Sequence, residues 1–326
     1  MRLVGLVPTV TARVGLAAIV ESALGRGGGA TGIGPGHVCP NLAPGMNGEE
    51  EYRNPRDGED GRRVGGNERS GWDPKFIEQV GKWVRPAVRT WFRAEVRGIE
   101  RIPAGGPVLL VANHSGGMIT PDGLVFAPAF YGHFGYDRPL HSLAHYGVVM
   151  GPLSLVMNRL GIIEASPDNA AAALDDGAVV LVFPGGDYDA YRPTAAANVI
   201  DFNGRTGYVK TAIRAGVPIV PLVSIGAQET QLFLTRGHRL AKLLRLTKFR
   251  LEIVPVSVGL PFGLSVFFPP NLPLPSKIVM EVLDPIDIAA QLGDDPDIDE
   301  VDAHVRVRMQ RSLDRLAARR RFPVLG

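Results

Sequence analysis

The sequence has one cysteine, Cys39, among its 326 residues. A single thiol excludes an internal disulfide and any metal cluster built on several cysteines, so a reducing cytosolic setting is expected. The sequence also lacks the His-Glu-x-x-His motif of zinc proteases and the Gly-x-Ser-x-Gly elbow of α/β-hydrolases. Its glycine cluster near residue 30 is not followed by Gly-Lys-Ser/Thr, and no glycine-rich dinucleotide fingerprint joins the first strand to its helix. These chemistries are therefore not predicted.

The chain also has no large excess of positive or negative charge and few long apolar runs. The net charge is +2 and the pI about 8.7, which is too weakly basic to imply nucleic acid as a partner. Residues 253–275 carry no charge, but six prolines among them rule out a helix that crosses a membrane. We expect an apolar loop there, which either lines a tunnel or inserts into a membrane interface. No transmembrane helix is predicted elsewhere in the chain.

The composition changes near residue 72. Residues 1–24 are apolar but interrupted by Arg13 and Glu21, which makes a poor signal peptide. Residues 25–71 are rich in glycine, proline and mixed charge, with little apolar surface to bury. We therefore expect residues 1–71 to be a disordered or mis-started tail, and residues 72–326 to form one folded domain.

Short apolar runs alternate with helical patterns through the folded part. This alternation is typical of an α/β fold, with a mixed, largely parallel sheet flanked by helices. The expected strands are 95–99, 108–112, 139–144, 178–183, 217–223 and 278–283. The expected helices begin near residues 73, 121, 166, 206 and 299.

The run 108–112 ends at Asn113-His114, and two glycines follow at 116 and 117. Thr120-Pro121-Asp122 then reads as the start of a helix. Asp122 is the only carboxylate between Glu100 and Asp137, so it is the one local acid available to orient the His114 ring. Such a pair is suited to general acid–base catalysis, and amides of the glycine turn are suited to an oxyanion. The alternative is a histidine that only caps the end of a strand.

A second candidate stretch is VFPGGDYDAYRP, residues 182–193, which also follows a buried run. In a parallel sheet it lies at the same edge as His114. The Arg192 guanidinium either binds a phosphate or carboxylate group or faces solvent without a bound ligand. We predict no metal ligands in either stretch.

Two basic stretches leave alternatives open. The helix expected from residue 73 carries Trp83, Trp91 and several arginines, and it either packs on the core or touches a membrane surface. Residues 236–250 place six lysines or arginines among leucines. That stretch suits an anionic membrane surface, or a solvated helix face whose leucines enter the core.

Four blocks of the sequence, in order and spacing, resemble the glycerolipid acyltransferase superfamily. They are VRGIERIPAGGPVLLVANHSGG (96–117), RLGIIEAS (159–166), VFPGG (182–186) and TGYVKTAIRAGVPIVPLVSIGAQET (206–230). The superfamily contains glycerol-phosphate, lysophospholipid and diacylglycerol acyltransferases. The last two blocks look most like the branch that contains the mono- and diacylglycerol acyltransferases.

The resemblance implies a glycerol-phosphate acyltransferase-like fold and an O-acyltransferase reaction. His114 would be the general base that deprotonates a lipid hydroxyl, such as that of a mono- or diacylglycerol or a lysophospholipid. Asp122 would orient the ring. The co-substrate would be acyl-CoA or acyl carrier protein, with no other cofactor. Substrate contacts are expected from Asn113, Ser115, Gly116, Gly117, Arg159, Phe183, Pro184, Gly185, Gly186 and Arg192.

The chain departs from the family pattern in two places. Seven residues separate His114 from Asp122, where the family usually has four. Pro184-Gly185-Gly186 stands where the phosphate-acceptor branch has Pro-Glu-Gly, which favours a neutral or differently charged acceptor. The alternatives are a non-catalytic lipid-binding or membrane-adaptor protein and an acyl thioesterase. A peripheral site on the cytoplasmic side of a membrane is expected, and the oligomeric state is left open.

Overall fold

The computed structural model describes residues 71–149, 153–245, 252–293, 295–322 and 324–325. The predicted tail therefore lies outside the described residues, apart from Gly71. The main sheet has seven strands in the order β1-β10-β6-β2-β5-β3-β4. They are β1 (Glu95–Arg97), β2 (Val108–Ala112), β3 (Leu140–Ala144), β4 (Ile162–Glu164), β5 (Val179–Val182), β6 (Ile219–Ile225) and β10 (Val279–Val282).

The sheet is mixed and largely parallel, as predicted. β4, β3, β5, β2 and β6 run parallel to one another, whereas β10 pairs antiparallel with β6. β1 lies at the edge, parallel to β10. Because β2 and β5 are parallel neighbours, the chain leaves both at the same edge of the sheet. The predicted juxtaposition of the His114 loop with the Pro-Gly-Gly turn is therefore confirmed.

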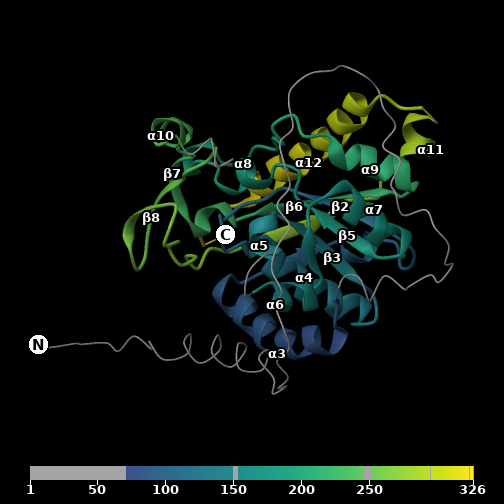
Figure 1. Cartoon of the computed structure of the whole chain (residues 1–326), viewed down its shortest axis with the longest axis horizontal. Helices are drawn as coiled ribbons and strands as arrows, with labels where there is room; N and C mark the ends of the chain where they lie inside the picture. The colour runs from purple at the N-terminus through teal and green to yellow at the C-terminus, as the bar shows by residue number, and fades with distance from the viewer. Residues whose placement is uncertain (1–70, 150–152, 246–251, 294, 323, 326) are drawn as a thin grey trace, which may run out of the picture. The chain divides into compact units, whose positions relative to one another are not determined.

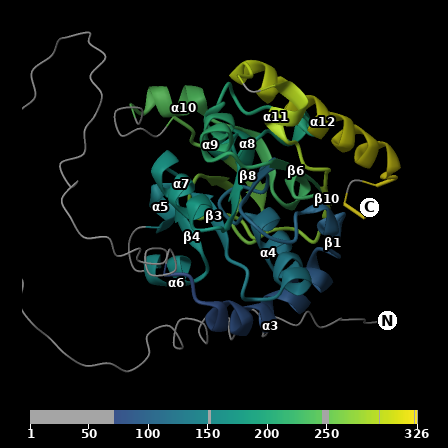
Figure 2. The same cartoon turned by 90° about the vertical axis from the view of Figure 1, so that its right-hand side faces the viewer.

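Helices cover both faces of this sheet (Figures 1 and 2). α7, α9 and α12 contribute to the core on one face, and α3 and α4 to the core on the other. The helices are α3 (Pro74–Trp91), α4 (Pro121–Phe134), α5 (Tyr146–Val149), α6 (Ser154–Arg159), α7 (Pro167–Asp175), α8 (Gly186–Ala190), α9 (Gly207–Ala215), α10 (His238–Leu243), α11 (Ile288–Leu292) and α12 (Ile298–Arg319). None of the described helices is both long enough and apolar enough to cross a bilayer.

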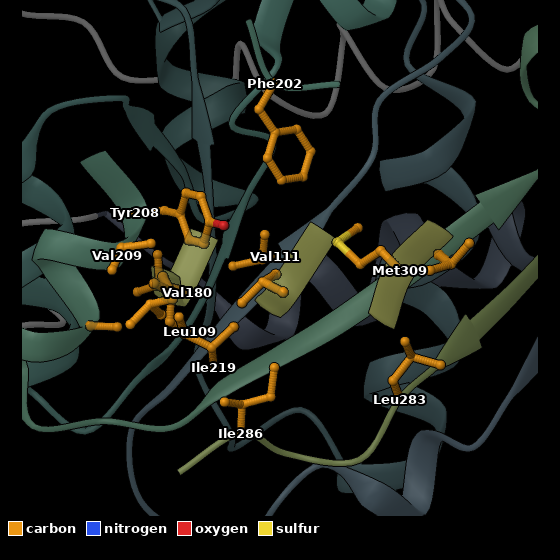
Figure 3. Packing of buried hydrophobic residues seen from close by; sticks show 14 of the residues in the cluster. Leu109, Val111, Val180, Phe202, Tyr208, Val209, Ile219, Leu283, Ile286 and Met309 are labelled. Atoms are coloured by element: carbon orange, nitrogen blue, oxygen red, sulfur yellow. The ribbon is translucent and has the colours of Figure 1, made fainter. Parts of the chain in front are cut away.

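β2 shows why the central strands are apolar throughout. All five of its residues are buried, since successive side chains point to opposite faces and helices cover both. Leu109 and Val111 enter the core beside α9 and α12, where Figure 3 shows them among Ile219, Tyr208 and Met309. The other three residues of the strand pack against α3 and α4. The predicted burial of this strand on both faces is confirmed.

Side chains cap several helices where the sequence indicated their starts. Asp73 Oδ1 accepts a hydrogen bond of 3.0 Å from the Phe76 amide at the start of α3. Ser166 Oγ accepts one of 3.1 Å from the Asn169 amide at the start of α7. α4 begins at Pro121, which has no amide hydrogen to leave unpaired.

The prediction of a loop at residues 253–275 is wrong, because the segment contains two strands. It contains β8 (Val256–Gly259) and β9 (Gly263–Val266), which join β7 (Leu232–Thr235) in a second, antiparallel sheet. The prolines flank these strands or lie in the turn between them, so they interrupt no strand pairing. Of the stretch 236–250, α10 covers six residues, and residues 246–251 lie outside the description.

Candidate active site

His114 and Asp122 lie together at the end of β2. The Nδ1 atom of His114 is 3.4 Å from the Oδ2 atom of Asp122. The Asp122 side chain is fully buried, and that of His114 is 11% exposed. The same Oδ2 atom accepts a hydrogen bond of 2.7 Å from the Ser115 amide, which fixes the carboxylate beside the ring. The seven-residue spacing therefore still brings the acid to the histidine.

Two glycines make this return of the chain possible. Gly116 and Gly117 have φ angles of +82° and +67°, in the left-handed region that other residues rarely adopt. A Cβ atom on Gly116 would lie 2.5 Å from Cδ of Pro121, the first residue of α4. One on Gly117 would lie 2.6 Å from Cζ of Phe233. The loop thus turns back tightly onto the start of α4, where Asp122 is held.

The Phe183 ring lies against the His114 ring. Their centroids are 4.4 Å apart, with 29° between the planes. Phe183 is the first residue after β5, so parallel pairing of β2 and β5 sets this contact. If Nδ1 carries the proton and donates to Asp122, Nε2 is left as the basic nitrogen. Stacking and the carboxylate together fix the orientation of that nitrogen.

Asp189 is a site residue that sequence reasoning missed. It lies in α8, is 2% exposed, and accepts a hydrogen bond of 2.7 Å from the His114 amide. Its other oxygen, Oδ1, is 2.6 Å from Arg192 Nη2. Burial raises the pKa of the Asp189 carboxyl, while the charge of Arg192 and the His114 amide act in the opposite direction. Asp189 therefore fixes the backbone that carries the candidate base.

The Pro-Gly-Gly turn is shaped around Asp189. A Cβ atom on Gly185 would lie 2.4 Å from Cβ and 3.1 Å from Cγ of Asp189. Asp189 thus lies directly against Gly185, the position at which the resemblance noted above implies a glutamate in phosphate-acceptor enzymes. Arg205, also unforeseen, donates from Nη1 to the Gly185 carbonyl at 2.9 Å and from Nη2 to Asp187 Oδ1 at 2.9 Å. Pro184 is buried in the same turn, and Gly186 begins α8 with a φ of +49°.

Three other predicted residues have protein partners. Asn113 joins β2 to β6: its side-chain amide donates to the Ser224 carbonyl at 2.9 Å and its oxygen accepts from the Ser224 amide at 2.8 Å. Arg192 is 5% exposed and paired with Asp189, so the expectation that it faces solvent is wrong. Arg159 lies 2.8 Å from Asp73 and 3.9 Å from the centroid of the Phe76 ring. Their contacts with substrate stay predictions.

A small polar cavity adjoins the site. Its lining includes Asn113, Ser115, Asp189, Arg192, Ser224 and Gln228. Burial, followed by the charge of Asp187, raises the pKa of nearby Tyr191 to about 12, so this phenol stays neutral near pH 7. Within the described residues, no three or more histidine, cysteine, aspartate or glutamate side chains are grouped as a metal site would require.

Comparison with known proteins gives the family. A family model described as Acyltransferase matches residues 93–225, which include His114, Asp122 and the Pro-Gly-Gly turn. An uncharacterized protein of Mycobacterium tuberculosis is 34% identical over 265 residues, or 78% of this chain and 71% of that protein. The protein belongs to the acyltransferase family. This acyltransferase is also 30% identical over 194 residues to a Bos taurus protein named DGAT1/2-independent enzyme synthesizing storage lipids.

That match covers 59% of the acyltransferase chain and 56% of the Bos taurus protein. Among solved structures, the acyltransferase is similar to the 1-acyl-sn-glycerophosphate acyltransferase PlsC from Thermotoga maritima. The TM-score is 0.49 at 18% identity, over 78% of this chain and 88% of that one. A likeness this distant carries no argument about the reaction. The family model therefore supports the acyltransferase activity that the sequence blocks indicated.

Proposed function

We propose that this acyltransferase moves a fatty acyl group from acyl-CoA or acyl carrier protein to a lipid hydroxyl, with His114 as the general base. The observation that supports the proposal most directly is the 3.4 Å separation of His114 Nδ1 from the buried Asp122 carboxylate. Catalytic hydrogen bonds are often long without substrate and shorten in the reactive complex.

The proposed reaction begins with a proton transfer. The acceptor hydroxyl gives its proton to Nε2 of His114, and its oxygen attacks the thioester carbonyl. The tetrahedral intermediate then expels the thiolate, which takes the proton back from the imidazolium. An ester and a free thiol result. Asp122 stabilises the imidazolium between these two steps.

The oxyanion that develops on the thioester carbonyl needs a hydrogen-bond donor. The backbone amides of the His114 loop are the candidates, and most of them already have an acceptor. The amides of His114, Ser115 and Gly117 already donate to Asp189, Asp122 and the Ala190 carbonyl. In the described part of the chain the Gly116 amide has no acceptor. We therefore assign the oxyanion contact to Gly116.

Two observations support a neutral glycerolipid, such as a mono- or diacylglycerol, as the acceptor. The Bos taurus relative is named for the synthesis of storage lipids. In this chain Gly185 stands where the resemblance implies a glutamate in phosphate-acceptor enzymes, and the neighbouring Asp189 carboxylate is already bound to Arg192 and the His114 amide. A lysophospholipid remains the second acceptor to test. A lipid acceptor also places the enzyme at a membrane surface, in keeping with the peripheral site predicted from the sequence.

The test is transfer of radiolabelled acyl-CoA to a panel of lipid hydroxyls. His114→Ala is expected to lower kcat by about 10²–10⁴-fold, the usual contribution of a general base. Asp122→Asn is expected to lower kcat less, because the ring remains. The matched control is His145→Ala, since His145 directly follows β3 but is exposed. Melting curves establish that each variant is folded.

Three outcomes would contradict the proposal. Unchanged turnover in His114→Ala would show that His114 is not the general base. Lipid binding without transfer to any acceptor would indicate a non-catalytic lipid-binding protein. Release of free fatty acid without an acylated lipid would indicate a thioesterase.

A further inference from the structure

The second sheet, β7–β9, has its apolar side chains on the outside, with the exception of Phe233. Leu232, Val258 and Leu264 lie side by side across the three strands and are 40%, 37% and 66% exposed. On the opposite face, Ser257 and Ser265 are neighbours and only 6% and 5% exposed. An antiparallel sheet with one solvated face normally shows the reverse pattern. An exposed apolar face of this kind marks a contact surface.

Aromatic and aliphatic side chains extend this face at its ends. Leu260 and Phe262, in the turn between β8 and β9, are 68% and 53% exposed. Phe268, just after β9, is 71% exposed. We call the exposed apolar side chains of the three strands and this turn, together with Phe268, the outer face. It is defined by Leu232, Leu234, Val258, Leu260, Phe262, Leu264, Val266 and Phe268.

Cations border the outer face. α10 lies next to β7 and β8, where Arg239 and Val256 line one hollow, and Figure 1 shows the three elements on the same side. Arg239, Lys242 and Arg245 are exposed. Among the described residues between 231 and 275, the lysines and arginines are Arg236, Arg239, Lys242 and Arg245, and Glu252 is the one carboxylate. The surface therefore combines exposed hydrocarbon with positive charge.

This combination complements one kind of partner. Apolar side chains enter the boundary between lipid headgroups and acyl chains, and lysine and arginine pair with anionic headgroups. We propose that the outer face and the cations of α10 dock on a bilayer that contains anionic phospholipid. A second copy of this chain would bring like charges together around the apolar contact, which disfavours it.

The docking surface is joined directly to the candidate active site. Phe233, on the inner side of β7, is 4% exposed and packs against Gly117 of the His114 loop. Its ring centroid is 5.5 Å from that of Tyr191. Arg236, which follows β7, donates to the Tyr188 carbonyl of α8 at 2.7 Å. If His114 acts as proposed above, docking holds the reactive loop at the membrane surface, where a lipid hydroxyl is delivered.

The experiment measures binding of the full chain to vesicles by flotation. The vesicles contain phosphatidylcholine alone, or phosphatidylcholine with phosphatidylglycerol. We expect binding to the mixed vesicles that weakens at high salt. The variant Leu264→Ser/Val266→Ser should lower the affinity about 10-fold or more, because both side chains leave the lipid. The matched control is Ile213→Ser/Val307→Ser, which alters exposed apolar residues of α9 and α12.

A second variant tests the charges separately. Arg239→Glu/Lys242→Glu should lower binding to the mixed vesicles about 10-fold or more and reduce its dependence on salt. The control is Lys210→Glu/Arg214→Glu, on the exposed side of α9. Binding by both test variants equal to that of the unaltered chain would overturn the proposal. So would a dimer, measured by light scattering, that Leu264→Ser/Val266→Ser dissociates.

Activity separates this proposal from the proposed function. The outer-face variant should lose transfer to an acceptor embedded in vesicles and keep transfer to the same acceptor dispersed in detergent. Loss of both would contradict a role confined to docking. If no acceptor is acylated at all, the proposed function fails, while the vesicle measurements still decide the docking surface.

Discussion

The end of β2 and the sheet β7–β9 differ in which side chains they bury: the first buries charged side chains, and the second exposes apolar ones. At the end of β2, the charged side chains of Asp122, Asp189 and Arg192 are buried and bonded to protein partners. On β7–β9, serines are buried, while Leu264 and its apolar neighbours face outward. Both regions depart from the usual distribution of residue types between interior and surface.

The two regions differ in whether the chain itself supplies the partners of these unusually placed side chains. Buried charges need partners within the chain, because an unpaired charge in the interior is strongly destabilising. At the end of β2, Asp189 and Arg192 bind each other, and Asp122 is bound through Oδ2, while its Oδ1 atom has no partner among the described residues. Removing one member of the Asp189–Arg192 pair would therefore leave an uncompensated buried charge. The outer face has no covering element in the described residues, so its apolar side chains contribute little to folding. Three pairs of variants test this contrast.

The largest effect is expected from removing Asp189. Asp189→Ala leaves Arg192 buried without its partner and the His114 amide without its acceptor. The free energy of unfolding should fall by about 3–5 kcal/mol, measured by urea denaturation. The control is Asp187→Ala, whose ion pair with Arg205 is about half exposed and should contribute about 0–1 kcal/mol. Equal losses in the two variants would remove the distinction between buried and exposed pairs.

A second pair of variants compares leucines of the two sheets. Leu110→Ala creates a cavity in a fully buried strand and should lower the free energy of unfolding by about 2–5 kcal/mol. Leu264→Ala removes a side chain that is 66% exposed and should change it by less than about 0.5 kcal/mol. The same denaturation measurement applies. A similar loss in both would mean that another part of the chain covers the outer face.

The smallest effect on stability is expected at the Pro-Gly-Gly turn. Gly185→Ala places a methyl group against Asp189 and should lower the free energy of unfolding by about 1–3 kcal/mol. Because Asp189 holds the His114 amide, kcat should fall as well. Gly105→Ala is the control, since no atom lies within 4 Å of its added Cβ, and its effect should stay within about 1 kcal/mol. Unchanged activity in Gly185→Ala would show that Asp189 does not position His114.

Much of the fold was predictable because its signals are local. Val108–Ala112 is an uninterrupted apolar run, which identifies a strand covered on both faces. Pro121 and Asp122 identify the start of α4, and that start holds the carboxylate beside His114. The family resemblance added the reaction type, which the family comparisons support.

The misses have a common physical origin. Asp187 and Asp189 stand two residues apart in the same short stretch, and only burial shows that Asp189 holds the His114 amide. Proline content indicated a loop at 253–275, although β8 and β9 fit between the prolines. The partner of Asp189 lies far away in the sequence, and the β8–β9 hairpin completes a sheet only by pairing with the more distant β7.

The sequence by itself determined the α/β alternation, the helix starts and the pairing of His114 with Asp122, because short-range sterics, capping and hydrophobic patterning act within a few residues. Only the tertiary structure decided that Asp189 supports His114 from 75 positions away and that the small sheet turns its apolar side outward. These features depend on which strand ends become neighbours and which faces stay uncovered, and both follow from the packing of the whole chain.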